Sequence, residues 1–471
     1  MSDNKKVVKA GIGYTVSNYL LKGLAFFTIP IFTRLMSTAD YGTFNTYAAY
    51  DSVLCIIVGM TLHSCFKSAK YKYGDKVKEF ISSCILLLLF NLLVWLMIIN
   101  ILYPVIGKSL QMNQWIINVL LFNCVGNAII QYYNSYIGLQ FEYKSFFKIA
   151  ALNSLSSIVL SVLLMSTLCN NDRATGRILG SAIPVIFIAI WIVNWFWRNG
   201  RPRIKLEYWK YALKFSGPTI PHGLSQVVLS QFDRIMISSM CGNAQAGLYS
   251  FGYNIYTLML VTANSLDSVW GPWLFERLHQ KDYESVRNVS GQYAFGILVF
   301  SCLIMMAAPE IIVILGTEEY KDAIYVVIPI VLGGFYSFLY TLPVQVEYYY
   351  EKTGYIALCS CGAAVLNIIL NWFFIPKYGY IAAAYTTVAT YLCYFIAHYV
   401  IAMKLSDGKL FNNMTMLGVI LISAVFGMVA LILIHKMIAR WIIIALIILS
   451  YGFLMEKEYK LLTTVINKLR H

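Results

Sequence analysis

Long apolar segments separated by short polar connections recur along almost the whole chain. Each extends over roughly 20 residues, the length an α-helix needs to cross the hydrocarbon core of a bilayer. Such spans are predicted at 11–33, 41–63, 80–103, 115–138, 146–169, 176–197, 211–239, 246–268, 291–315, 324–350, 355–376, 379–403, 412–435 and 441–455. The pattern therefore predicts an all-α polytopic membrane protein with about 14 transmembrane helices.

The composition excludes a soluble enzyme and a disordered chain. Of the 471 residues, 59% are apolar and only 12% are charged, whereas a soluble domain carries about 25% charged residues. The sequence contains no phosphate-binding loop, no nucleophile elbow and no H-E-x-x-H motif. Its cysteines show neither C-x-x-C nor zinc spacing. We therefore expect no catalytic residue, no metal site and no cofactor, with a proton or another ion as the candidate coupling species.

Basic residues are distributed unevenly between alternate connections. If the N-terminus is cytoplasmic, 26 of the 36 lysines and arginines fall in cytoplasmic segments, 8 fall outside, and Lys22 and Arg234 lie within spans. By the positive-inside rule, this bias predicts that both termini are cytoplasmic. Topology signals and contacts with anionic lipids also account for the net charge of +14, so we expect no nucleic-acid partner.

A basic connection near the middle of the chain divides the spans into two sets of six. We predict an N-terminal lobe (1–197), a cytoplasmic linker running into the seventh helix (198–214), a C-terminal lobe (211–403), and two extra helices with a cytoplasmic tail (404–471). The segment 39–44 also resembles 244–249, at an offset of 205 residues. Copies separated by six spans share one orientation, which predicts two lobes related by a pseudo-two-fold axis along the membrane normal.

Ionisable residues inside spans are the most informative, because burying one costs at least a few kcal/mol. Lys22 and Asp51 fall near the midplane of the first two spans. Either they form a structural ion pair, or Lys22 lines a cavity for an anionic headgroup while Asp51 orients it or exchanges a proton. Asp233 and Arg234 are adjacent on the seventh span and diverge by about 100°, so they cannot simply pair with each other. Asp233 is a candidate charge partner or proton-coupling group, and Arg234 either faces a cavity or has a structural role at an interface. Arg34 lies at a similar height on the first span, where it either lines a cavity or has a structural role at an interface.

Two further carboxylates and two prolines complete the candidate set. Asp267 and Glu347 lie at the predicted cytoplasmic ends of their spans. We expect them to reach water or to pair with a loop lysine, and proton coupling is the alternative. Pro218 and Pro221 interrupt the helical hydrogen-bond ladder, which predicts a kink or local unwinding that acts as a hinge.

Motifs spread over most of the first 400 residues carry a family resemblance. They are Gly13–Tyr19, Ile29–Leu35, Asp40–Phe44, Phe232–Ile237, Gly247–Ser250, Tyr350–Thr353, Asn367–Asn371 and Ile375–Gly379. Each motif alone is loose, but in this order and spacing they resemble the polysaccharide-transport (Wzx-type) oligosaccharide flippases. That family looks like a member of the larger MOP superfamily, which contains the multidrug and toxin (MATE) extruders and the lipid II flippases.

The resemblance implies two six-helix lobes around a central V-shaped cavity with alternating access. It further implies transport of an undecaprenyl-pyrophosphate-linked oligosaccharide repeat unit from the cytoplasmic to the outer leaflet of a bacterial inner membrane, for O-antigen or capsule synthesis. Membrane lipids, a polysaccharide polymerase and a chain-length regulator are the other candidate partners.

Lys22, Arg34 and Arg234 are the cations that we expect to meet the anionic pyrophosphate. An ion-coupled multidrug extruder of the same superfamily would instead rely on carboxylates and aromatic residues to bind organic cations. The spans contain charges of both signs, so this alternative stays open. A membrane enzyme of glycan synthesis is a further alternative, which the short loops disfavour.

Overall fold

A computed structural model describes the backbone of residues 3–110 and 112–469, and the side chains of residues 13–105, 112–221 and 223–453. Every regular element within these ranges is helical, as predicted, because a helix satisfies its backbone hydrogen bonds within one segment and can therefore cross a bilayer. The helices of the first half are α1 (Asp3–Leu35), α2 (Thr38–Gly59), η1 (Leu62–Cys65), α3 (Phe66–Tyr73), η2 (Gly74–Lys76), α4 (Val77–Leu110), α5 (Gln114–Gly138), α6 (Tyr143–Ser166), α7 (Arg173–Gly200), α8 (Leu206–Ser216) and α9 (Thr219–Cys241). Those of the second half are α10 (Asn243–His279), α11 (Tyr283–Leu315), η3 (Glu318–Ala323), α12 (Ile324–Leu339), α13 (Thr341–Tyr349), α14 (Thr353–Tyr378), α15 (Tyr380–Leu405), α16 (Asn413–Ile432) and α17 (Met437–Leu469).

Ten segments of the described chain are helical, long and apolar enough to cross a membrane, so the protein is a multi-pass membrane protein. They are Gly13–Leu35, Leu62–Val105, Gln114–Gly138, Tyr143–Ser166, Arg173–Gly200, Tyr283–Leu315, Glu318–Tyr349, Thr353–Tyr378, Tyr380–Leu405 and Asn413–Ile432. The predicted spans 41–63, 211–239 and 246–268 also form helices, but these are not apolar enough to be counted among the ten. Met437–Phe453 is a shorter apolar helix, and the total of about 14 spans stays a prediction.

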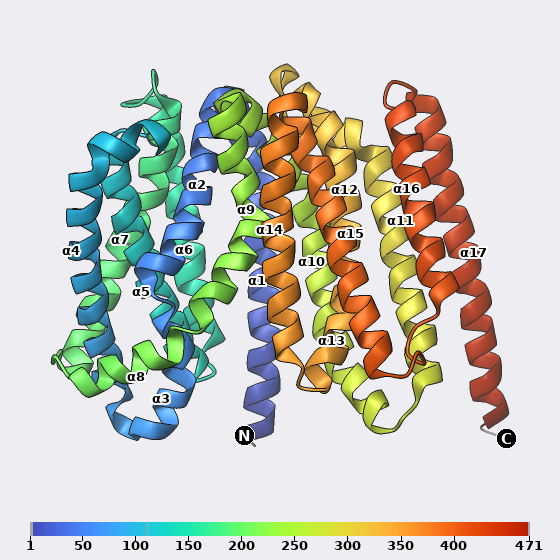
Figure 1. Cartoon of the computed structure of the whole chain (residues 1–471), viewed down its shortest axis with the longest axis horizontal. Coiled ribbons are helices and arrows are strands. Elements are labelled where there is room, and N and C mark those ends of the chain that lie inside the picture. The colour runs from blue at the N-terminus through green and yellow to red at the C-terminus, as the bar shows by residue number, and fades with distance from the viewer. Residues whose placement is uncertain (1–2, 111, 470–471) are drawn as a thin grey trace. The chain divides into compact units, whose positions relative to one another are not determined.

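Contacts divide the chain into two compact units. Unit 1 comprises Met1–Ser250 and Ser360–Tyr380, and unit 2 comprises Phe251–Cys359 and Ile381–His471. In unit 1, α7 packs against α4, α5 and α6, while α2 packs against α5 and α9 (Figure 1). In unit 2, α11 packs against α12, α16 and α17. The division into lobes at 1–197 and 211–403 stays a prediction.

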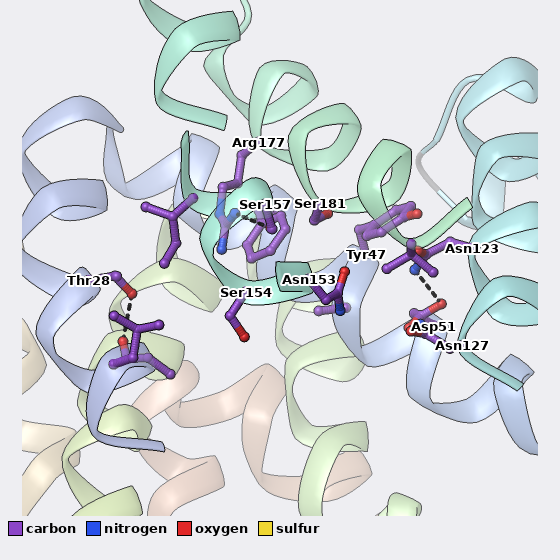
Figure 2. Close-up of a pocket in the computed structure, with 16 residues that line it drawn as sticks. Thr28, Tyr47, Asp51, Asn123, Asn127, Asn153, Ser154, Ser157, Arg177 and Ser181 are labelled. Carbon is purple, nitrogen blue, oxygen red and sulfur yellow. Dashed lines mark hydrogen bonds between the residues drawn. The ribbon is translucent and has the colours of Figure 1, made fainter. Parts of the chain in front are cut away.

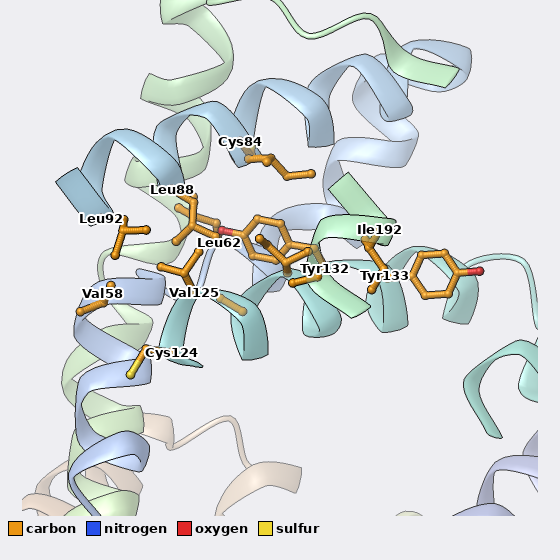
Figure 3. Close-up of a cluster of buried hydrophobic side chains, with 14 of the residues drawn as sticks. Val58, Leu62, Cys84, Leu88, Leu92, Cys124, Val125, Tyr132, Tyr133 and Ile192 are labelled. Atoms are coloured by element: carbon orange, nitrogen blue, oxygen red, sulfur yellow. The ribbon is translucent and has the colours of Figure 1, made fainter. Parts of the chain in front are cut away.

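A core of buried apolar side chains holds helices α2 to α8 of unit 1 together (Figure 3). Since lipid tails are as apolar as these side chains, close packing rather than exclusion from water favours their association. Tyr132 of α5 is fully buried and meets Phe66 of α3 edge-on, with ring centroids 5.0 Å apart. The other core residues labelled in the figure are Val58, Leu62, Cys84, Leu88, Leu92, Cys124, Val125, Tyr133 and Ile192. This core fixes the relative positions of α2, α5 and α7, which carry polar residues of the site described below.

Two glycines of the predicted repeat meet where α2 and α10 begin. A Cβ atom on Gly42 would collide with the backbone of Asn243 and Gly247, and one on Gly247 would collide with the backbone of Thr38 and Gly42. At the offset of 205 residues, Asn243 is the equivalent of Thr38 and Gly247 is the equivalent of Gly42. The contact is therefore reciprocal, as at a two-fold interface, and it supports the predicted pseudo-symmetry at this point.

Candidate functional site

A half-open polar cavity lies within unit 1, among α1, α2, α5, α6 and α7 (Figure 2). It contains about 830 Å³ of empty space, including its open mouth. Uncharged amides and hydroxyls dominate the polar part of its wall, which also holds one carboxylate and one guanidinium. The polar wall residues are Thr28, Tyr47, Asp51, Asn123, Asn127, Asn153, Ser154, Ser157, Arg177 and Ser181.

Asp51 supplies the carboxylate of this wall. The Asn123 side-chain amide donates to its Oδ1 at 2.9 Å, and the Asn127 amide donates to its Oδ2 at 3.2 Å. Asn123 and Asn127 are one helical turn apart on α5, which is why both amides reach the same carboxylate. The thiol of Cys124 adds a third donor, 3.2 Å from Oδ1. Among the described residues, the donors to Asp51 are therefore all neutral, and Asp51 is half-buried beside the cavity.

Arg177 supplies the cation. Its Nη1 donates to Ser161 Oγ at 2.7 Å and lies 3.4 Å from Ser157 Oγ. The guanidinium stacks over the rings of Phe32 and Phe44, with its carbon 3.9 and 4.5 Å from their centroids. Aromatic faces and hydroxyl oxygens stabilise a guanidinium without neutralising its charge. Within the described residues no carboxylate forms an ion pair with Arg177, so it can meet an anionic group.

Lys22 lies on α1 just beyond the cavity wall. Ala25, which lines the cavity, follows three residues later, so the two side chains project from the same face of the helix. In the described part of the chain Lys22 forms no ion pair with Asp51, although both side chains are half-buried. The structural ion pair considered from the sequence is thus not formed in this conformation, and a substrate role for Lys22 stays a prediction.

Arg34 is exposed near the end of α1, where its Nη1 donates to the Pro30 carbonyl at 2.9 Å. A cation near the carboxyl end of a helix is stabilised by the unpaired carbonyl groups there. The structure therefore provides a local role for Arg34. A contact with substrate stays a prediction.

Asp233 and Arg234 are both buried, with exposed fractions of 2% and 6%, and they have different partners. Asp233 accepts hydrogen bonds from the Tyr249 hydroxyl and the Asn371 amide, each at 2.6 Å, which link α9 to α10 and α14. Arg234 donates to Gln231 Oε1 of its own helix at 2.6 Å. The predicted substrate role of Arg234 and coupling role of Asp233 stay predictions.

Glu347 corrects the sequence interpretation. Its side chain is 0% exposed, and its Oε1 lies 2.6 Å from Nδ1 of His398 on α15. The expectation that it reaches water or a loop lysine is wrong, because the short helix α13 turns this side chain towards α15. Asp267 is half-buried and accepts a hydrogen bond from the Gln345 amide at 3.1 Å. Proton coupling by either carboxylate stays a prediction.

The predicted interruption at the two prolines is present. α8 ends before Gly217 and α9 begins after Pro218, which is its N-cap residue, while Pro221 lies in the first turn of α9. A proline near the start of a helix removes an N–H group that would have no partner in the helix. Beside the break, the hydroxyl oxygens of Thr219 and Thr61 are 2.8 Å apart. The break is confirmed, and its movement as a hinge stays a prediction.

One group of candidate metal ligands adjoins the cavity. The ligand atoms of Asp51, Cys55 and Cys124 lie within 4.8 Å of one another. A structural zinc ion would require thiolates and a fourth ligand. Here both thiols donate to Asp51 Oδ1, Cys124 at 3.2 Å and Cys55 at 3.6 Å. The three side chains therefore already form a hydrogen-bonded network that needs no metal.

Arg177 is the site residue that sequence reasoning missed. Positive-inside counting assigns it to an outer connection together with Arg173, where a cation needs no further explanation. Arg177 nevertheless lies one turn further along α7, about 6 Å deeper in the membrane. The one-turn spacing of Asn123 and Asn127 on a predicted span was a second available signal.

Known proteins similar to this chain point to one family. Residues 7–276, more than half of the chain, match the family described as polysaccharide biosynthesis protein. Protein 1 of the Lsg locus of Haemophilus influenzae is 23% identical over 384 residues, which cover 77% of this chain and 90% of that protein.

Two solved structures share the fold. The lipid II flippase MurJ in an inward closed conformation has a TM-score of 0.72 and 14% identity, covering 95% of this chain and 99% of that chain. An inward-facing multidrug resistance MATE family transporter of the MOP superfamily has a TM-score of 0.62 and 15% identity, covering 83% of this chain and 95% of that chain. At such identities the likeness concerns the fold alone, which this chain shares with a flippase and a multidrug transporter. The chain belongs to the polysaccharide biosynthesis protein family and has the fold of MOP-superfamily transporters.

Proposed function

We propose that this chain translocates an undecaprenyl-pyrophosphate-linked oligosaccharide repeat unit from the cytoplasmic to the outer leaflet of the bacterial inner membrane. It would act by alternating access, in the synthesis of O-antigen or capsule. The supporting observation is a polar cavity among membrane helices in a member of the polysaccharide biosynthesis protein family. Amides and hydroxyls suit the hydroxyl groups of a sugar, since both can donate and accept hydrogen bonds.

Cations at two depths suit the pyrophosphate. In the proposed topology, Arg177 lies four residues from the outer end of α7, and Lys22 lies 13 residues from the outer end of α1. At 1.5 Å per residue these positions are about 6 and 20 Å below the outer ends of their helices. A headgroup arriving from the cytoplasm would therefore reach Lys22 before Arg177. Arg34, at the outer end of α1, would then be close to the exit.

The proposed topology places both termini in the cytoplasm. It is supported by the distribution of 26 lysines and arginines on one side and 8 on the other. Membrane lipids, a polysaccharide polymerase and a chain-length regulator are the proposed partners. The interruption at Gly217 and Pro218 is where we expect the helices to bend during transport.

Substitutions at Lys22, in a deletion strain of the protein's own host, test this function whatever sugar the lipid carries. We expect Lys22→Arg to retain part of the surface glycan, and Lys22→Ala and Lys22→Glu to lose it, because only arginine keeps a cation for the pyrophosphate. Membrane abundance should stay normal in all three variants, since no ion pair with Asp51 is broken. Surface glycan and membrane abundance are measured together.

Lys144→Ala is the matched control, because Lys144 is an exposed lysine at the start of α6 with no proposed role. Full glycan display from Lys22→Glu would contradict the substrate role of Lys22. Deletion that sensitises cells to cationic drugs and leaves the glycan intact would instead favour the multidrug extruder. The Asp51 carboxylate in the cavity wall is the observation that keeps this second candidate in the test.

A further inference from the structure

A fully buried pair of ionisable groups belongs to unit 2, whereas the polar cavity belongs to unit 1. Glu347 of α13 and His398 of α15 are 51 positions apart in sequence, yet their Oε1 and Nδ1 atoms are 2.6 Å apart. Both side chains have an exposed fraction of 0%. A carboxylate is almost never buried this completely unless it is paired, and ionisable groups within membrane helices mark ion or proton pathways.

Aromatic rings and neutral or acidic groups surround the Glu347–His398 pair. The ring centroids of Tyr394 and Tyr340 lie 4.6 and 5.9 Å from that of the imidazole. The other titratable groups that act on the pair or on these tyrosines are Tyr256 and Asp267 of α10, Tyr348 of α13 and Cys359 of α14. Within the described residues, neither member of the pair forms an ion pair with a lysine or an arginine.

Two atoms of the pair are buried and have no hydrogen-bond partner among the described residues, namely Glu347 Oε2 and His398 Nε2. One proton lies between Nδ1 and Oε1. If it is the only proton, the pair carries one negative charge in an apolar interior, which is unfavourable. A second proton on Nε2 converts the imidazole to imidazolium and makes the pair neutral overall. Burial therefore favours the neutral pair with two protons. Water that reaches the pair would stabilise the negatively charged pair with one proton.

We propose that the Glu347–His398 pair binds one proton from the aqueous phase on the lone pair of His398 Nε2, and that this proton couples translocation to the proton gradient. This inference rests on the proposed transport function. On binding, the proton leaves water and forms an N–H bond at Nε2. On release it returns to water, while the Nδ1 proton stays hydrogen-bonded to Glu347.

The position of α13 provides a way to open the pair. Glu347 lies in the last turn of α13, which continues α12 through Tyr340, a residue with helical backbone angles whose carbonyl accepts a hydrogen bond from the Val344 amide. The Glu347 carbonyl accepts a hydrogen bond from the Lys352 amide at 2.9 Å, and Glu351 and Lys352, just beyond the helix, are exposed. Unwinding of this last turn would separate Oε1 from Nδ1 and admit water over a short distance. Proton release would then accompany one conformation of the transport cycle.

The protonation state of His398 is the first measurement. The full chain, labelled with ¹⁵N-histidine, is placed in bilayers of phosphatidylethanolamine and phosphatidylglycerol, and the ring nitrogens are followed by NMR as the pH is raised. We expect one histidine with both nitrogens protonated at neutral pH that loses one proton in alkali. That signal should be absent in His398→Gln and should become singly protonated in Glu347→Gln. Exposed His435 is the internal reference, and a wild-type His398 that is singly protonated at every pH would overturn the proposal.

Proton uptake is the second measurement. Proteoliposomes that contain a pH-sensitive dye and the host's own lipid-linked oligosaccharide extract are exposed to an acidic outer buffer. We expect the wild-type protein to take up protons faster than protein-free vesicles, and Glu347→Gln/His398→Gln to show only the rate of protein-free vesicles. The two amides of this double variant can still hydrogen-bond to each other, so we expect it to fold. Unchanged uptake by this folded double variant would overturn the coupling role. Loss of glycan on deletion tests the proposed function independently, so failure of either proposal is recognised separately.

Discussion

Asp51 and Glu347 are both carboxylates on membrane helices, but the protein stabilises them in different ways. Asp51 is half-buried beside a cavity, and neutral amides and thiols donate to it. Glu347 is fully buried, and among the described residues a single titratable partner, His398, lies within hydrogen-bond distance. Several neutral donors can hold a carboxylate after any one of them is lost. A carboxylate with one partner depends on that partner entirely, which makes it sensitive to the proton that the partner carries.

Removing the imidazole partner of Glu347 should give the largest effect. His398→Leu removes one partner of a buried pair and leaves the Glu347 carboxylate without it. We expect the free energy of unfolding to fall by about 3–5 kcal/mol. The double variant Glu347→Leu/His398→Leu should recover most of that loss, because no uncompensated charge remains. Unfolding of the purified variants in SDS measures the difference. Equal losses in the single and double variants would show that packing, and not the unpaired charge, sets the stability here.

Changes at Asp51 should cost less and should depend on the replacement. Asp51→Leu leaves the amides of Asn123 and Asn127 without their acceptor, at about 1–3 kcal/mol for each group that stays buried. Asp51→Asn keeps one acceptor oxygen, so we expect a loss of about 1 kcal/mol or less. The same SDS titration compares the two variants. If Asp51→Asn destabilises as much as His398→Leu, the proposed contrast between the two carboxylates is wrong.

The smallest effect should come from the ion pair that joins the linker to the start of α4. The Lys205 ammonium lies 2.6 Å from Glu79 Oε1, and this pairing raises the pKa of Lys205 above its ordinary value of 10.5. Since the pKa is raised on folding, the contribution is fully present below pH 10.5 and is lost as the pH rises through the raised value. We expect Lys205→Met to be close to wild type at neutral pH, because exposed ion pairs contribute little. Stability curves of both proteins against pH should converge in strong alkali, and a difference that grows there would contradict this assignment.

Part of the site follows from residue types that can be recognised along the chain. Pro218 and Pro221 predict an interruption, and α8 and α9 separate just before Pro221, because proline acts on the local backbone. Gly42 and Gly247 stand at equivalent repeat positions, and their backbones meet. His398 was not singled out, because one histidine in an apolar span says nothing about a partner on another helix. Arg177 was missed because a cation near a loop satisfies the topology rule without any site.

The class of protein, its helical spans and its family can all be derived from the order of residues along the chain. The hydropathy of a span and the interruption of a helix by proline each depend on residues that are close together in sequence. Both can therefore be recognised without coordinates. The groups that each buried charge meets became visible only once the helices were packed: Asn123 and Asn127 for Asp51, and His398 for Glu347. Those partners come from other helices, and helix packing, to which many side chains contribute at once, sets which faces meet.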